Sequence, residues 1–206
     1  MGNYVPPPAF HTFDPIRLSP EKIFGAISSS ILGNHEELME SVSGLGGLSL
    51  EEGIEPPVDQ ATLLFISVLD WEKDGSTPRP LDSGHSRERL GRFPSNDGNA
   101  IEYLLEYTGG EGGDIIHDLL SKLGRGLSEE SLGVSGFSRG SGGVELLGWL
   151  DDSEVNDLRD EIEKGGWSVL SNEPLDGGVQ DAFRHLLVIL RAACRGKCGL
   201  LMRRHS

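Results

Sequence analysis

A long amphipathic segment near the C-terminus limits the folds that are open to this chain. Residues 179–195 carry apolar side chains at spacings of three and four, which places them on one face of a helix. Gly196 is suited to end this helix, because glycine readily adopts the left-handed conformation that follows many helices. The apolar run Cys198–Met202 then predicts a short strand. It would be buried best by pairing with a second predicted strand at Val144–Leu150, so we expect a small sheet packed against a helix.

Polar residues that can cap a helix precede the other periodic segments. Asp151 is followed at the third position by Glu154, which is the spacing of a capping box. The apolar run within residues 59–71 also suits a strand, but its length and the capping residue Asp59 favour a helix. A further short strand is expected at residues 167–170. The predicted helices begin at Ser19, Asn34, Asp59, Asp97 or Asn99, Asp114, Asp151 and Val179.

These elements predict an α+β fold that is mostly helical, with a small sheet formed by short strands in the C-terminal third. A chain of 206 residues fits a single compact domain, residues 1–206, with long loops. The apolar fraction of 36% indicates a modest core. We expect an extended, proline-rich N-terminal arm at residues 1–18 and a long polar surface loop at residues 72–96.

Charge and composition limit the compartment and the partners. The formal net charge of −15 argues against nucleic-acid binding, which needs a basic surface. Two cysteines make no disulfide framework, so a reducing, cytoplasmic location is predicted. We expect no targeting signal and no membrane partner, since the longest apolar stretch, Ala61–Leu69, is too short to span a bilayer.

The C-terminal tail is basic although the chain as a whole is acidic. Residues 184–206 contain six lysine and arginine residues and no aspartate or glutamate. One interpretation is an internal match, in which the tail lies against the acidic remainder of the domain, and the other is a local patch for an anion or a partner. We favour the internal match, because a terminal element usually packs on its own domain.

The tail also holds both cysteines, Cys194 and Cys198, beside His205. A zinc site needs about four ligands, and only three are present here. A redox pair would place its thiol at a helix N-terminus, whereas Cys194 falls near a helix C-terminus. We therefore predict core or near-core thiols, with no metal and no cofactor.

A polar loop offers the one candidate ligand site. It contains His85, Arg87, Arg89 and Arg92, and arginines of this kind can bind a carboxylate or phosphate through paired hydrogen bonds. The alternative is a solvated loop without a ligand. No catalytic residues are predicted, because a working triad is assembled from separate elements. The glycines at 136–143 precede a strand rather than a helix, which argues against nucleotide binding.

The C-terminal half resembles the YfbM-like proteins and related small bacterial domains of unknown function. The similarity covers about residues 97–202 and consists of packing motifs, while the N-terminal third departs from the pattern. It implies a bacterial, cytoplasmic α+β domain with an immunity or accessory role, and no established catalytic residues. The residues that carry it are Gly148, Trp149, Leu150, Glu154, Val155, Ala193, Gly196 and Gly199–Met202.

Three functions remain open from the sequence. The first is a non-enzymatic binding protein of immunity or accessory type, whose acidic surface binds a basic protein partner. The second is an enzyme or ligand sensor that binds a small anion at the His85–Arg92 loop. The third is an acidic mimic of nucleic acid. We favour the first, because the chain is strongly acidic and shows no catalytic signature.

Overall fold

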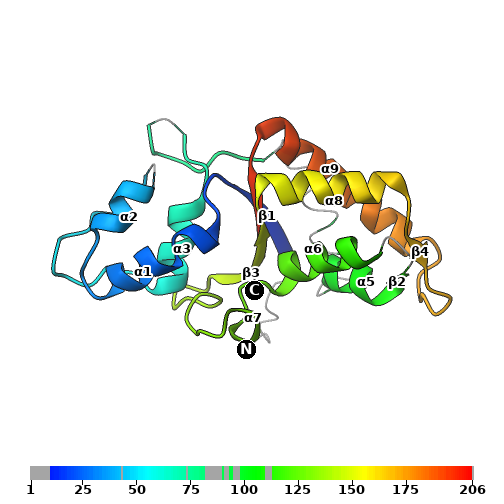
Figure 1. The fold of residues 1–206 in the computed structure, drawn as a ribbon, viewed down its shortest axis with the longest axis horizontal. Helices are drawn as coiled ribbons and strands as arrows, with labels where there is room; N and C mark the ends of the chain where they lie inside the picture. The colour runs from blue at the N-terminus through cyan, green and yellow to red at the C-terminus, as the bar shows by residue number, and fades with distance from the viewer. Residues whose placement is uncertain are drawn as a thin grey trace, which may run out of the picture.

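A three-stranded antiparallel sheet lies in the middle of the molecule (Figure 1). The computed structural model describes residues 10–42, 44–72, 74–81, 90, 93–94, 98–109 and 113–205. The strands are β1 (Phe10–Ile16), β3 (Glu145–Leu150) and β5 (Gly199–His205), in the order β1-β5-β3. The last strand of the chain is therefore the central one. The predicted α+β class, mostly helical with a small sheet, is confirmed.

The predicted pairing of the two C-terminal strands is also confirmed. β3 and β5 are antiparallel, with Leu150 opposite Leu200 and Glu145 opposite Arg204. The register shifts between Leu146 and Gly148, as in a β-bulge. The short strand expected at 167–170 is β4 (Ser168–Val169), which pairs with β2 (Thr108–Gly109) in a separate two-stranded sheet.

The N-terminal segment forms the other edge of the central sheet. Strand β1 is antiparallel to β5, with Phe13 opposite Met202 and Ile16 opposite Gly199. The sequence predicts an extended arm at residues 1–18. Of these, residues 1–9 lie outside the described residues. Residues 10–16 are extended, but they belong to the sheet, which is thus not confined to the C-terminal third. Pairing with a strand 189 residues away leaves no local signal in the sequence.

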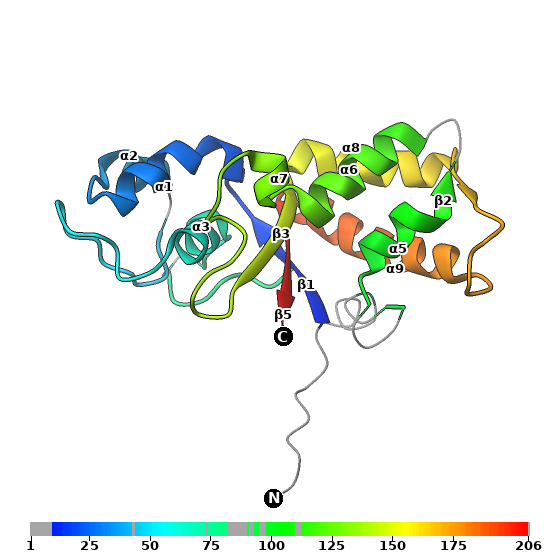
Figure 2. The ribbon, with the colours of Figure 1, turned by 90° about the horizontal axis from the view of Figure 1, so that it is seen from below.

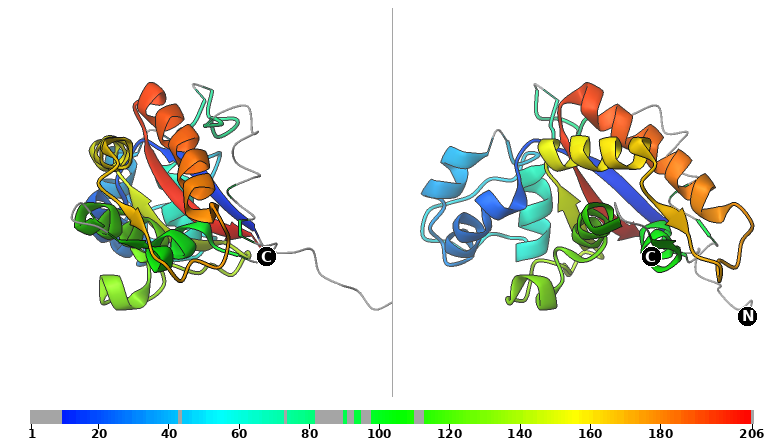
Figure 3. Two further views of the ribbon diagram at one scale, coloured as in Figure 1. Left: turned by 90° about the vertical axis from the view of Figure 1, so that its right-hand side faces the viewer. Right: turned by 45° about the vertical axis from the view of Figure 1, so that its right-hand side comes forward.

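Helices from the second half of the chain cover one face of the sheet (Figures 2 and 3). Phe13, Leu150, Leu200 and Met202 contribute the sheet's share of this core, and the amphipathic faces of the helices supply the remainder. The predicted stripe of residues 179–195 is buried here. The helices are α5 (Ala100–Tyr107), α6 (Gly113–Arg125), α8 (Asp152–Lys164) and α9 (Gly178–Gly196).

A second core lies on the opposite face of the sheet. Leu201 points into it, although its neighbours on β5 belong to the first core, because side chains alternate along a strand. Trp149 is buried here. The two cores share one sheet, so the chain forms a single compact domain. The elements around the second core are η1 (Pro20–Lys22), α1 (Phe24–Ile31), α2 (Glu36–Ser41), α3 (Gln60–Val68) and α7 (Glu129–Leu132).

Three of the predicted helix starts have the expected side-chain caps. Asp59 accepts a hydrogen bond from Thr62 N, and the predicted helix is confirmed over Gln60–Val68, although it ends before Trp71. Asn99 caps α5. Asp151 and Glu154 form the reciprocal capping box of α8.

Ser19 is an N-cap residue as predicted, but its side chain makes no cap bond and the element is a short 3-10 turn. Two other predicted end residues are wrong. His35, not Asn34, precedes α2. Gly196 stays helical, and the left-handed residue is Lys197, with φ 49°. Arg17 explains this shift, because its guanidinium donates hydrogen bonds to the carbonyl oxygens of both Gly196 and Lys197.

Part of the loop expected at residues 72–96 is described. It begins as a tight turn in which Glu72 N donates to Thr77 O at 2.9 Å. Arg79 N donates to Asp70 O, which returns the chain to the end of α3. Leu90 is buried in the first core. The loop is therefore fastened to the domain at both ends of its described part.

Candidate functional site

The candidate anion site cannot be placed. His85, Arg87, Arg89 and Arg92 lie outside the described residues. Within the part of the chain that the structure describes, no group of three or more histidine, cysteine, aspartate or glutamate side chains could hold a metal ion.

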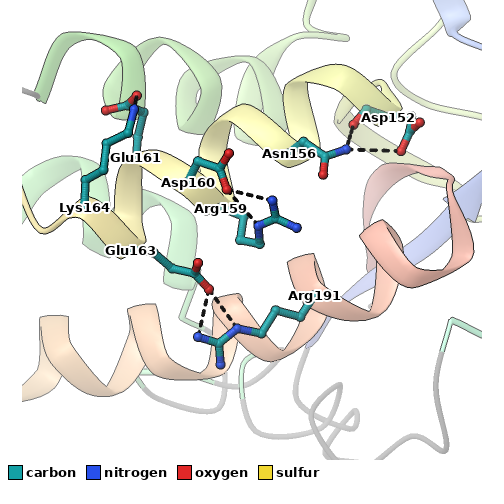
Figure 4. A network of polar contacts seen from close by, with 8 residues as sticks. All are labelled: Asp152, Asn156, Arg159, Asp160, Glu161, Glu163, Lys164 and Arg191. Atoms are coloured by element: carbon teal, nitrogen blue, oxygen red, sulfur yellow. Dashed lines mark hydrogen bonds and ion pairs between the residues drawn. The ribbon is translucent and has the colours of Figure 1, made fainter.

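The basic tail pairs with acidic groups of its own domain. Arg203 is bound to Asp14 on the neighbouring strand β1. Arg191 on α9 reaches Glu163 on α8 at 2.8 Å (Figure 4). Arg184 pairs with Asp181, and Arg204 lies 4.0 Å from Glu145. These pairs bear out the internal electrostatic match for four of the six basic residues of the tail.

The two cysteines are free thiols of low reactivity. Cys198 is buried, and its Sγ donates to the carbonyl of Ala193. Burial raises the pKa of Cys198 to about 11, and burial likewise raises the pKa of Cys194. Because the thiolate is the nucleophile and the metal ligand, neither side chain is prepared for redox chemistry. The prediction of core or near-core thiols is confirmed.

The glycine-rich loop before β3 binds a carboxylate of the same chain, that of Asp59. Ser141 donates from its backbone N and its hydroxyl to the Asp59 carboxylate, at 2.7 and 2.6 Å. The same carboxylate caps α3. Desolvation opposes the charge, but these hydrogen bonds outweigh it and lower the pKa of Asp59 to about 2. The hydrogen bonds therefore attach this loop to the start of α3, which is a structural role.

Two hollows flank the end of α6 and contain basic side chains. One, of about 340 Å³, is lined by Arg125 and Arg139, and the other, of about 540 Å³, by Lys122 and Arg125. Each cation already has a carboxylate partner. Lys122 lies 2.6 Å from Glu154, and Arg139 3.1 Å from Glu145. The hollows are therefore close to neutral and do not favour an anionic ligand.

Negative charge is concentrated in one region, which we call the acidic lobe. It comprises residues 23–72, which include α1, α2 and α3, at one end of the molecule (Figure 1). This segment has no lysine or arginine. Its acidic residues are at positions 36, 37, 40, 51, 52, 55, 59, 70 and 72.

Two contacting turns of the acidic lobe expose apolar side chains. Gly53 N donates to Gly33 O at 2.8 Å, which holds the turns together. Leu32 on the first turn is 84% exposed, and Ile54 on the second is 56% exposed. We call this pair of turns the Leu32–Ile54 platform. A single exposed apolar residue is ordinary, whereas these two lie on turns that a backbone hydrogen bond holds together, in a segment rich in glutamate.

A buried histidine fixes the platform. His35 Nε2 lies 2.9 Å from Ile54 O and 3.1 Å from Glu51 O. Carbonyl oxygens only accept, so Nε2 carries the proton and Nδ1 accepts from the Ser30 hydroxyl at 2.7 Å. The sequence gives no local signal for this role, because the carbonyl groups that accept from His35 lie 16 and 19 residues further along the chain.

An aromatic pocket lies near the other end of the molecule, where α5 meets the segment before α9. Its volume is about 430 Å³. The Tyr103 and Tyr107 rings lie 4.8 Å apart, and Phe93 packs edge-on against Tyr103 at 5.1 Å. The described residues that line the pocket are Pro94, Gly98, Asn99, Glu102, Tyr103, Glu106, Tyr107, Pro174 and Leu175.

No protein-family model, curated protein or solved structure matches this chain. The resemblance to the YfbM-like proteins stays a prediction. No helix in the described part of the chain combines the length and apolar character needed to cross a membrane. Functional inference therefore depends on the acidic lobe and the aromatic pocket.

Proposed function

We propose that this chain is a non-enzymatic binding protein, and that the acidic lobe contacts a basic protein partner. The observation that carries the proposal is the charge of the lobe. The structure gives Glu36, Glu37, Glu40, Glu51 and Glu55 no ion pair within the described residues, and all five are exposed. In contrast, the basic residues elsewhere are largely paired within the domain.

Unpaired charges of one sign supply long-range attraction. A partner with exposed lysines and arginines would be steered toward the lobe, and salt would weaken this attraction. Charge complementarity mainly raises the association rate and excludes wrong partners. The lobe therefore accounts for selectivity toward basic proteins.

The Leu32–Ile54 platform supplies the apolar contact that steering alone lacks. Desolvation of an apolar side chain at the centre of an interface, surrounded by polar groups, contributes much of the binding energy. The His35 hydrogen bonds hold both turns in place before the partner arrives. A preformed contact surface loses little conformational entropy on binding.

The wider proposal keeps a bacterial, cytoplasmic setting and an immunity or accessory role. The free thiols Cys194 and Cys198 support a reducing compartment. The anion sensor with its His85–Arg92 loop and the nucleic-acid mimic remain predictions. No described contact favours either of them over a protein partner.

The first experiment is native mass spectrometry of the untagged protein purified gently from its host. We expect a stoichiometric complex with a basic protein. Its affinity should fall steadily as sodium chloride is raised, because screening shortens the reach of the lobe's field. A bare monomer, or an affinity that salt leaves unchanged, would contradict the proposal.

A matched pair of charge variants locates the contact surface. Glu36→Gln/Glu37→Gln/Glu40→Gln removes three charges from the lobe and should slow association with the captured partner about tenfold at low salt. The control Asp118→Asn/Glu129→Gln/Glu130→Gln removes three charges elsewhere and should change it little. Equal effects of the two variants would mean that net charge, not the lobe, attracts the partner.

A further inference from the structure

We propose that the aromatic pocket is a second binding site, and that its ligand is a guanidinium group, as carried by arginine. This site does not depend on the acidic lobe or on the proposed protein partner. Three features favour this ligand: the electron density of the aromatic rings, the negative charge of the pocket, and the planar shape of the guanidinium group.

Both tyrosine rings are hydrogen-bond donors to carboxylates. Tyr103 donates its hydroxyl proton to Glu173 Oε1 at 2.8 Å, and Tyr107 donates to Glu106 Oε1 at 2.9 Å. Donation to an anion increases the electron density of a phenol ring. The negative face of an aromatic ring attracts a cation, and this attraction grows when the cation loses water. Tyr103 is only 6% exposed and packs in the first core, so the half-buried Tyr107 ring provides the face that a cation can reach, with Tyr103 behind it.

The described part of the pocket lining is acidic. Among the lining residues that the structure describes, none is lysine or arginine. Glu102 is neutralised by Arg125, whose Nε lies 2.7 Å from Oε1. Glu106 is exposed, and among the described residues the Tyr107 hydroxyl donates a hydrogen bond to its side chain. A ligand with one positive charge would complete the pairing of Glu106.

A guanidinium group fits these features better than an ammonium group does. It is planar and weakly hydrated, it stacks on aromatic faces, and its N–H groups match a carboxylate. The volume of about 430 Å³ exceeds what one methyl or ammonium group would fill. Pro94, Pro174 and Leu175 provide apolar walls for the methylene chain that carries the group.

The rigidity of the Tyr103 wall supports a preformed site. Glu173 also accepts from Val179 N at 2.6 Å, so the carboxylate is fixed at the start of α9. Gly178 allows this arrangement, since a Cβ at this position would lie 2.5 Å from the Tyr103 hydroxyl. The ring therefore cannot move away from the pocket without breaking its hydrogen bond to a carboxylate that the start of α9 holds in place.

The test is an NMR titration of the full chain with N-acetyl-L-arginine methylamide, a backbone-blocked arginine. We expect saturable shifts at the Tyr103 and Tyr107 rings. The citrulline analogue has the same shape without the charge and should bind at least about tenfold more weakly. Shifts that do not saturate by about 50 mM, or equal binding of the citrulline analogue, would overturn the proposal.

Free L-arginine separates the two sources of the group. It adds a charged α-ammonium and a charged α-carboxylate to the same side chain, so weaker binding than that of the blocked compound assigns the pocket to an arginine within a peptide. Equal or tighter binding assigns it to the free amino acid. Both outcomes support a guanidinium site.

Two variants and a control localise the binding. Glu106→Gln removes an exposed carboxylate without threatening the fold and should weaken binding about threefold, and Tyr107→Leu about fivefold. Glu129→Gln, which removes a charge far along the chain from the pocket, should leave binding unchanged. Unaltered binding in Glu106→Gln would refute the role of the pocket even if Tyr107→Leu failed to fold.

Discussion

Gly148 illustrates how backbone packing can dictate one residue. A Cβ at this position of β3 would overlap the carbonyl oxygen of Lys122 and crowd that of Leu123, in the last turn of α6. These atoms are backbone and cannot rotate away. Only glycine lets the helix approach the strand this closely.

We therefore expect Gly148→Ala to lower the free energy of unfolding by about 3 kcal/mol or more. Gly25→Ala is the control, because no atom lies within 4 Å of a Cβ there and the residue is in α1. Alanine should stabilise that helix by up to about 1 kcal/mol. Urea denaturation measures both, and a near-neutral Gly148→Ala would show that the close approach is wrong.

Asp59 should make the free energy of unfolding depend on pH. Its folded-state pKa of about 2 lies below the usual 3.8, so its contribution is full above pH 3.8 and is lost as the pH falls through 2. Asp59→Asn should cost about 2 kcal/mol at pH 7, and the difference from wild type should shrink between pH 4 and pH 2. Denaturation at several pH values tests this, and a difference that is constant with pH would contradict it.

Strand β5 is the central strand of the sheet and connects the two hydrophobic cores on its opposite faces. It pairs with strands on both edges, and its side chains alternate between the two cores. The helices on either side bury their apolar faces in one core each. The strand thus couples the stability of the helices on one face to that of the helices on the other.

Leu200→Ala and Leu201→Ala should each cost about 2–5 kcal/mol, although the residues are adjacent and face opposite ways. Each should still give one cooperative transition, since loss of either core removes support from the shared strand. Val188→Ala, at a site 41% exposed, is the control and should cost under about 0.5 kcal/mol. Two separate transitions in thermal unfolding would show that the cores fold independently.

The whole molecule carries a net charge of −15, and its acidic lobe has no internal cation. Like charges repel in the compact state, and salt screens the repulsion. The unpaired carboxylates of the lobe therefore lower the stability of the free protein. This cost is expected wherever binding, rather than folding, selects the charge.

The lobe variant Glu36→Gln/Glu37→Gln/Glu40→Gln should accordingly be more stable than wild type by about 0.5–1 kcal/mol at low salt. The gain should vanish at high salt. Thermal unfolding at two salt concentrations measures it. A gain that salt does not change would point to helix propensity instead of charge repulsion.

Local patterns in the sequence determined much of the fold. The stripe of α9, the capping box at Asp151 and the pairing of β3 with β5 all depend on neighbouring residues or on one obvious apolar partner. Tertiary contacts decided the remainder. Strand β1 pairs with β5 across almost the whole chain, and Arg17 shifts the end of α9 from Gly196 to Lys197.

The candidate sites divide in the same way. The sequence alone determined the acidic character and the matching basic tail, because charge is a property of composition. Only the tertiary structure decided which carboxylates remain unpaired, that Leu32 and Ile54 lie on contacting turns, and that Tyr103 meets Glu173. The physical reason is range: capping and periodicity act within a few residues, whereas burial and pairing are set by segments that only folding brings together.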